Sequence, residues 1–117
     1  MIKINLHYNN QDALWCFVLE GHAGYADHGQ DIVCAAVSMI AINTINSIDS
    51  FTQEPLLLDQ DDKGGYIHCT FPDIKVNKGS VEATLLLKSM VLGLNSIQEQ
   101  YGKYIQIITN KNSSGGE

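Results

Sequence analysis

A histidine and a cysteine near the end of the first third of the chain are the residues most suited to nucleophilic chemistry. His22 follows Gly21, and Cys34 follows a glycine-rich stretch that ends at Gln30. A thiolate is a strong nucleophile, and a neighbouring imidazole can accept the thiol proton or form a thiolate–imidazolium pair with it. The order of the two residues fits several classes of cysteine-dependent enzyme and is diagnostic of none.

The elements around this pair predict how it is positioned. Residues 2–8 and 14–19 are two predicted strands joined by a turn, which favours an antiparallel hairpin. Residues 21–30 form a predicted loop, because glycines disfavour helix and strand, with Gly24 and Gly29 as candidate hinges. Asp31 is expected to cap the next helix, which would place Cys34 at its third position. There the helix dipole and free N–H groups would stabilise a thiolate and an oxyanion.

The rest of the chain predicts a single α+β domain. The helix that follows Asp31 is expected to run to Phe51. Pro55 precedes predicted strands at 56–59 and 66–71, and Gly79-Ser80 opens a helix to Tyr101 with Val81, Leu85 and Leu92 among its apolar residues. A last strand is expected at 104–109. The order ββαββαβ indicates two helices packed on one mostly antiparallel sheet over residues 1–109, with a disordered tail at 110–117. The core stripe of the first helix is expected at Val33, Val37, Ile40, Thr44, Ile45 and Ile48.

Several other side chains have a structural and a functional interpretation. His28 is an alternative base, but it lies mid-loop in this prediction, whereas His22 is anchored beside a strand. Asp31 is a cap that could also orient His22 or bind substrate. Ser38 lies one helical turn from Cys34 on the same face and could contact the site or bond to its own helix.

The remaining histidines and cysteines are expected to be structural. His7 and His68 fall in strand patterns, and Cys16 and Cys69 are strand residues typical of buried filler. One alternative is a metal site made of His22, His28 and Cys34. Its spacing is irregular and no fourth ligand is evident, so neither a metal nor another cofactor is expected.

Composition limits the partners and the compartment. The net charge is −6 with only seven Lys and Arg, which argues against direct nucleic-acid binding. The longest apolar stretches are interrupted by Ser, Lys, Asn or Gly, so neither a membrane span nor a signal peptide is expected. Three cysteines without a CxxC pair favour free thiols in the cytoplasm.

The stretch from Gly21 to Ser38 resembles a known family. Gly21-His22-Ala23, followed by Gly29-Gln30-Asp31-Ile32-Val33-Cys34-Ala35-Ala36-Val37-Ser38, is similar to the signature of the ribosomal-processing cysteine protease family, Prp. The resemblance extends over the chain except its tail. It implies Cys34 as nucleophile and His22 as base, and it assigns no third catalytic residue. Separately from the resemblance, Gly21, Asp31 and Ser38 are candidates for binding or orienting the substrate.

The resemblance also implies a substrate. Such an enzyme would be a cytoplasmic homodimer that removes the N-terminal extension of ribosomal protein number twenty-seven of the large subunit. It would cut after an aromatic pair. A non-catalytic ribosome-assembly module on the same fold is the alternative, and the reactivity of the Cys34 thiol discriminates between the two.

Overall fold

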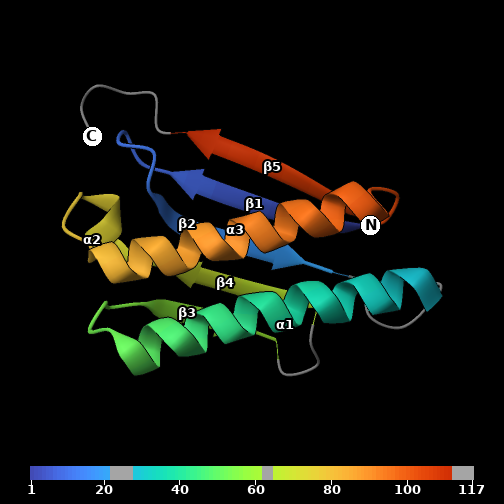
Figure 1. Ribbon diagram of the computed structural model, residues 1–117, viewed down its shortest axis with the longest axis horizontal. Coiled ribbons are helices and arrows are strands. Elements are labelled where there is room, and N and C mark those ends of the chain that lie inside the picture. The colour runs from blue at the N-terminus through green and yellow to red at the C-terminus, as the bar shows by residue number, and fades with distance from the viewer. Residues whose placement is uncertain (22–27, 62–64, 112–117) are drawn as a thin grey trace.

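The computed structural model describes residues 1–21, 28–61 and 65–111, and these residues form a two-layer α+β domain (Figure 1). Two long helices lie on one face of a five-stranded sheet. The elements are β1 (Ile2–Tyr8), β2 (Leu14–Glu20), α1 (His28–Phe51), β3 (Leu57–Gln60), β4 (Tyr66–Thr70), α2 (Pro72–Lys75), α3 (Val81–Tyr101) and β5 (Ile105–Lys111).

The sheet has the strand order β3-β4-β2-β1-β5. The pairs β1–β2, β2–β4 and β3–β4 are antiparallel, whereas β5 crosses over to pair with β1 in parallel. The predicted ββαββαβ order and the mostly antiparallel sheet are therefore confirmed, with the single turn of α2 added before the second long helix. Strands β3 and β5 are the two edges of the sheet.

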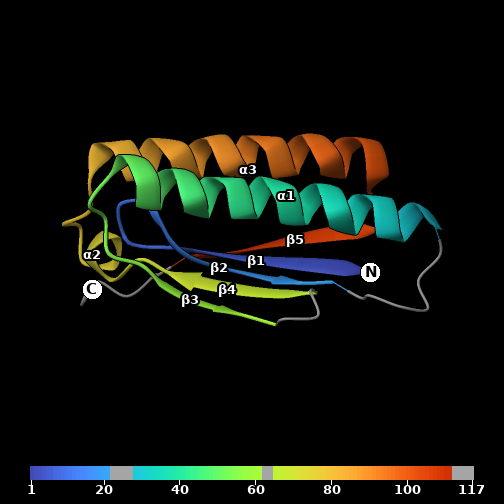
Figure 2. The same cartoon turned by 90° about the horizontal axis from the view of Figure 1, so that it is seen from below.

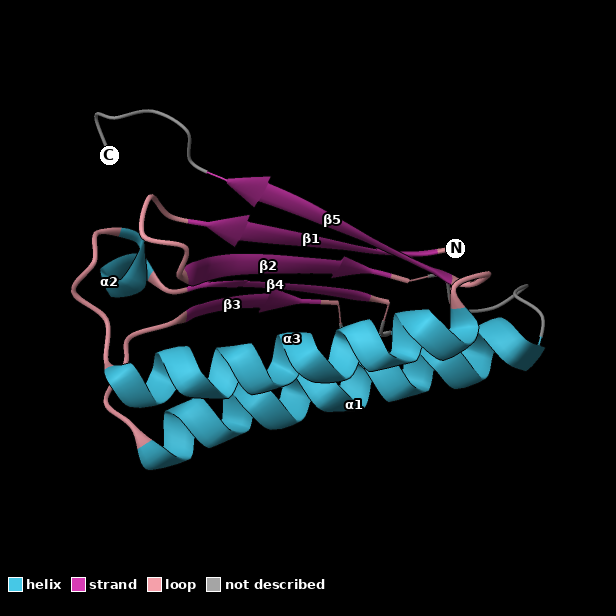
Figure 3. Cartoon of the chain, turned by 45° about the horizontal axis from the view of Figure 1, so that its top comes forward, coloured by secondary structure: helices cyan, strands magenta, loops and turns pink. Residues whose placement is uncertain are grey.

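Helices α1 and α3 lie side by side and cover the same face of the sheet (Figures 2 and 3). Among the described residues no long helix covers the other face, which we call the open face. The predicted stripe of α1 is confirmed, because Val33, Val37, Thr44, Ile45 and Ile48 are buried. Ile40 is half-buried and faces α3, where a β-carbon on Gly93 would lie 3.3 Å from its Cδ1. The absence of a side chain at Gly93 thus lets the two helices approach closely.

The second long helix begins where the sequence predicts. The Ser80 hydroxyl accepts a hydrogen bond from the Ala83 N–H at 3.1 Å, which is a standard N-cap. The buried face of α3 consists of Ala83, Leu87, Met90 and Leu94. Val81, Leu85 and Leu92, the apolar residues singled out in the sequence, are exposed.

Two boundaries differ clearly from the sequence-based expectation. Helix α1 begins at His28, so the prediction of a loop through Gln30 is wrong at its last three residues. A β-carbon on Gly29 would lie 2.6 Å from Tyr104 Cζ, so this glycine allows the helix to pack against Tyr104. That tertiary packing overrides the low helix propensity of glycine. At the other end, β5 continues to Lys111, two residues past the predicted strand.

Helix α1 is also long and apolar enough, between Asp31 and Phe51, to cross a membrane by length and composition alone. This differs from the expectation drawn from the interrupted apolar stretches. A core helix of a soluble protein meets the same criteria, and α1 buries one face against the sheet.

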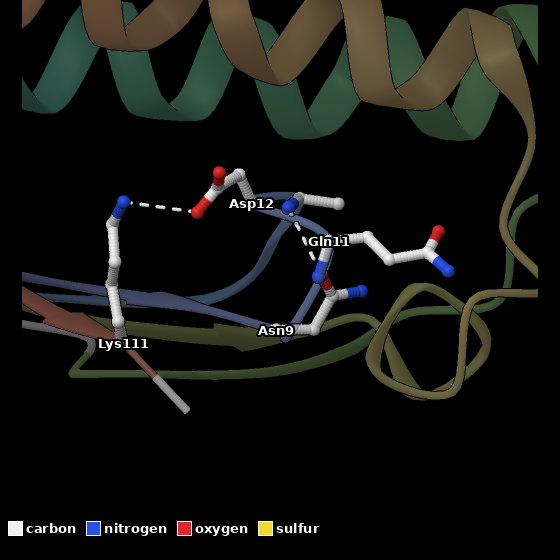
Figure 4. A network of polar contacts seen from close by, with 5 residues as sticks. Asn9, Gln11, Asp12 and Lys111 are labelled. Atoms are coloured by element: carbon white, nitrogen blue, oxygen red, sulfur yellow. Dashed lines mark hydrogen bonds and ion pairs between the residues drawn. The ribbon is translucent and has the colours of Figure 1, made fainter. Parts of the chain in front are cut away.

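Asn9 stabilises the end of the sheet remote from Gly21. Its side chain is buried, and its Nδ2 donates to Ile74 O at 2.7 Å and to Asn77 Oδ1 at 2.8 Å. Its Oδ1 accepts from the N–H groups of Gln11 and Ala13 at 2.8 and 3.0 Å. Figure 4 shows this turn beside the exposed ion pair between Asp12 and Lys111. One amide therefore ties the β1–β2 turn to α2.

We expect Asn9→Ala to lower the free energy of unfolding by about 2–4 kcal/mol, because it leaves several buried backbone and side-chain groups without partners. Urea unfolding measures the change. Asn43→Ala, on the exposed side of α1, is the matched control and should change stability by less than about 0.5 kcal/mol. Equal effects of the two substitutions would contradict this account of Asn9.

Candidate active site

Cys34 is the cysteine that the fold leaves accessible. Cys16 and Cys69 are buried in β2 and β4, whereas Cys34 is half-buried on α1. Burial raises the pKa of the Cys69 thiol to about 12 and also raises that of Cys16. Both thiols are therefore protonated and unreactive at neutral pH, which fits their expected structural role.

Gly21 packs directly against the sulfur of Cys34. A β-carbon built on Gly21 would lie 2.8 Å from Cys34 Sγ, closer than such atoms approach in proteins. The Gly21 N–H donates to Gly65 O at 2.7 Å, which holds the end of β2 to the start of β4. The close approach of chain and thiol thus depends on glycine at position 21.

Gly65 completes this contact from the other strand. Its φ is +88°, a left-handed conformation that favours glycine. A β-carbon at this position would also come within 3.2 Å of Gly21 O. The sequence analysis did not select Gly65 as a site residue, although this glycine directly precedes the strand predicted at 66–71.

His22 follows Gly21 in the chain and lies outside the described residues, as does Gly24. The structure therefore places the residue before His22 against Cys34 Sγ and leaves the imidazole undescribed. His28 lies within the described backbone of α1 rather than in the predicted loop. His7 and His68 lie in strands β1 and β4, as expected.

Asp31 is not the N-cap of α1, and this prediction is wrong. The helix begins three residues earlier, so Asp31 is an exposed acidic residue of its first turn and Cys34 is a full turn further in than predicted. Inside an α-helix, the Cys34 N–H points to the carbonyl four residues before it. That N–H is consequently not a free donor for an oxyanion, contrary to the prediction.

Ser38 lies one turn after Cys34 on the same side of α1, as predicted, and opens onto a pocket of about 220 Å³. We call this the helix-side pocket. It lies between α1 and the β3–β4 hairpin and is lined by Ser38, Ile42, Gln60, Asp61, Gly65, Tyr66 and Ile67. A half-buried thiol beside a pocket of this kind suits covalent attack on a bound, extended substrate.

The alternative metal site cannot be assembled from the described residues. It needs His22, which is outside them, and among residues 1–21, 28–61 and 65–111 no three His, Cys, Asp or Glu side chains are grouped to hold an ion.

Gly29 was expected to act as a hinge of the loop, but it lies inside α1. Its close packing on Tyr104 explains why a glycine is needed at this position.

Comparison with known proteins identifies the family. The family model described as cysteine protease Prp matches residues 1–106. The ribosomal processing cysteine protease Prp of Bacillus subtilis is 30% identical over 110 residues, which cover 94% of this chain and 98% of the relative. The protein of the same name from Staphylococcus aureus strain Mu50 is 31% identical over 107 residues, with 92% and 97% covered.

Solved structures agree with this assignment. The essential ribosomal processing protease Prp from S. aureus, in complex with a substrate peptide, superimposes with a TM-score of 0.83 at 29% identity. A second structure, with a covalently linked product peptide, gives 0.81 at 30% identity. Each comparison covers 94% of this chain and 100% of the other. The chain belongs to the cysteine protease Prp family.

Proposed function

We propose that this cysteine protease removes the N-terminal extension of ribosomal protein number twenty-seven of the large subunit, cutting after an aromatic pair. The observation that carries the proposal is the half-buried Cys34 thiol, which packs against Gly21 and lies one helical turn from Ser38 of the helix-side pocket. The names of its relatives support a ribosomal substrate, and the S. aureus relative was solved with a substrate peptide and with a covalently linked product peptide.

The proposed chemistry is acyl transfer. His22 accepts the proton of the Cys34 thiol, and the sulfur attacks the scissile carbonyl carbon. The tetrahedral intermediate collapses to a thioester as the C–N bond breaks, and His22 protonates the leaving amine. Water, deprotonated by His22, then hydrolyses the thioester and regenerates the thiol. No cofactor is required.

The remaining site residues are assigned around this step. Gly21 keeps the chain that carries His22 against the sulfur, and Ser38 lies at the mouth of the helix-side pocket. Asp31, exposed on the first turn of α1, is available to orient His22 or to bind the substrate. Gly24 is assigned as a hinge of the segment that would close over the peptide.

We place the reaction in the cytoplasm, where newly made ribosomal protein is available, and assign the enzyme as a homodimer. Free cysteines suit that reducing compartment. The partner is the precursor protein itself, since the acidic chain is poorly suited to bind nucleic acid directly.

Cys34→Ala should abolish cleavage of a peptide that matches the substrate extension, as measured by mass spectrometry. Melting temperature should change little, because the side chain is small and half-buried. Cys16→Ala and Cys69→Ala are the matched controls, which should lower stability but keep activity. Substantial cleavage by Cys34→Ala would overturn the protease mechanism, and an inert Cys34 thiol in the folded parent would favour a non-catalytic binding module.

His22→Ala should reduce kcat by roughly 10²–10⁴-fold, as loss of a general base does. His28→Ala should have a smaller effect, because His28 belongs to helix α1 in this structure. Steady-state kinetics of both variants, with iodoacetamide alkylation of Cys34 as a second readout, provide the comparison. A larger loss for His28→Ala would move the base to that residue.

Gly21→Ala should lower kcat/KM at least tenfold, because the added β-carbon collides with Cys34 Sγ and must displace it or residue 22. Gly93→Ala is the matched control. It introduces a milder contact, 3.3 Å from Ile40 Cδ1 at the α1–α3 interface, and should affect melting temperature but not kcat/KM. If both variants lost stability and activity in parallel, Gly21 would have only a packing role.

A further inference from the structure

The edge strand β3 presents apolar side chains to solvent beside the candidate active site. Strand β3 pairs only with β4 in the five-stranded order, and all four of its residues are exposed. Leu57 is 65% exposed and Leu58 is 42% exposed. Exposed apolar residues on an edge strand favour pairing with another strand.

The backbone of β3 is suited to such pairing. The Asp61 N–H donates to Tyr66 O at 3.2 Å, which makes this a hydrogen-bonded pair of the β3–β4 ladder. Because hydrogen-bonded and non-hydrogen-bonded pairs alternate, Asp59–His68 and Leu57–Thr70 are hydrogen-bonded in the same register. The N–H and C=O groups of Leu58 and Gln60 therefore point away from β4, toward the free edge.

Pockets lie on both faces of the sheet at this edge. The helix-side pocket includes Gln60, and a pocket of about 270 Å³ on the open face is lined by Leu57, Leu58, Asp59, His68 and Thr70. Side chains of a strand alternate between the two faces of a sheet. A strand added to β3 would thus direct successive side chains into the two pockets in turn.

The edge is continuous with the candidate active site. Ser38 lines the helix-side pocket one turn from Cys34, and Gly65 of the same pocket contacts Gly21, which packs on Cys34 Sγ. Neighbouring strands lie about 4.8 Å apart, so a peptide added to β3 would run about 14 Å from the line of β2 and would reach the thiol only by turning across the helix-side pocket. Asp59 lines the open-face pocket, and no described Lys or Arg lines that pocket.

We propose that an extended segment of the substrate, several residues away from the scissile bond, adds to β3 as a sixth strand. Its apolar side chains alternate between the helix-side and open-face pockets, and a basic side chain is favoured near Asp59. Main-chain hydrogen bonds to Leu58 and Gln60 supply affinity, and the pockets supply specificity. This inference rests on the proposed protease function and names the surface that recognises its substrate.

An N-methyl scan of the substrate peptide tests the pairing. Each backbone N–H of the peptide is methylated in turn, and KM and kcat are measured with the parent protein. Because every second residue of an added strand faces β3, KM should rise at least tenfold at two positions separated by one tolerant position. Uniform sensitivity, or none, would overturn strand addition while leaving the protease function intact.

Protein variants locate the surface. Leu57→Lys should raise KM at least tenfold with little change in kcat, whereas Leu92→Lys, at a comparably exposed leucine on α3, should change neither. Equal kinetics for the two variants would overturn the proposal. So would a Leu57→Lys variant whose sedimentation shows loss of a dimer, because a second copy would then occupy this edge.

A failure of the proposed protease function can be distinguished from a failure of strand addition. If the parent protein does not cleave the peptide, that function is wrong, and strand addition is measured by fluorescence anisotropy of the labelled peptide on Cys34→Ala. Weaker binding at alternate N-methyl positions supports the pairing in that case as well. Absence of binding overturns it.

Discussion

The close packing of Gly21 against the Cys34 sulfur is the contact on which the arrangement of the site depends. It joins the end of β2 to one side of α1 and so joins the two layers of the domain. The hydrogen bond from Gly21 N–H to Gly65 O fixes this position from the neighbouring strand. Any side chain at residue 21 would occupy the volume of the sulfur, so the chain that leads to His22 passes at a distance only glycine allows.

Burial separates the three thiols by function. Cys16 and Cys69 are in the interior of the sheet, where burial raises their pKa values and keeps them protonated at neutral pH. Cys34 is half-buried at the side of α1. Because the cysteine lies beyond the first turn of α1, the helix N-terminus contributes less to thiolate stability than a capped, shorter helix would. The proposed activation therefore depends more on the imidazole of His22.

Much of this fold could be predicted from the sequence, because its local signals agree with its tertiary structure. The alternation of apolar and polar residues predicted β1, and the 3.6-residue spacing of Val33, Val37 and Ile48 predicted the buried face of α1. The start of α1 could not be predicted, since Gly29 is helical only through its packing on Tyr104, far away in the chain. The role of Gly65 could not be predicted either, because its contact with Gly21 forms only when β2 and β4 pair.

The two edges of the sheet are protected to different degrees. On β5 the exposed positions are polar, with Gln106, Thr109 and Lys111 facing solvent. Strand β3 instead exposes Leu57 and Leu58, and only its short length and Asp59 discourage edge-to-edge association. A domain that needed only stability would gain by replacing these leucines with polar residues. An enzyme that must hold an extended peptide gains from an edge that pairs briefly and releases its product.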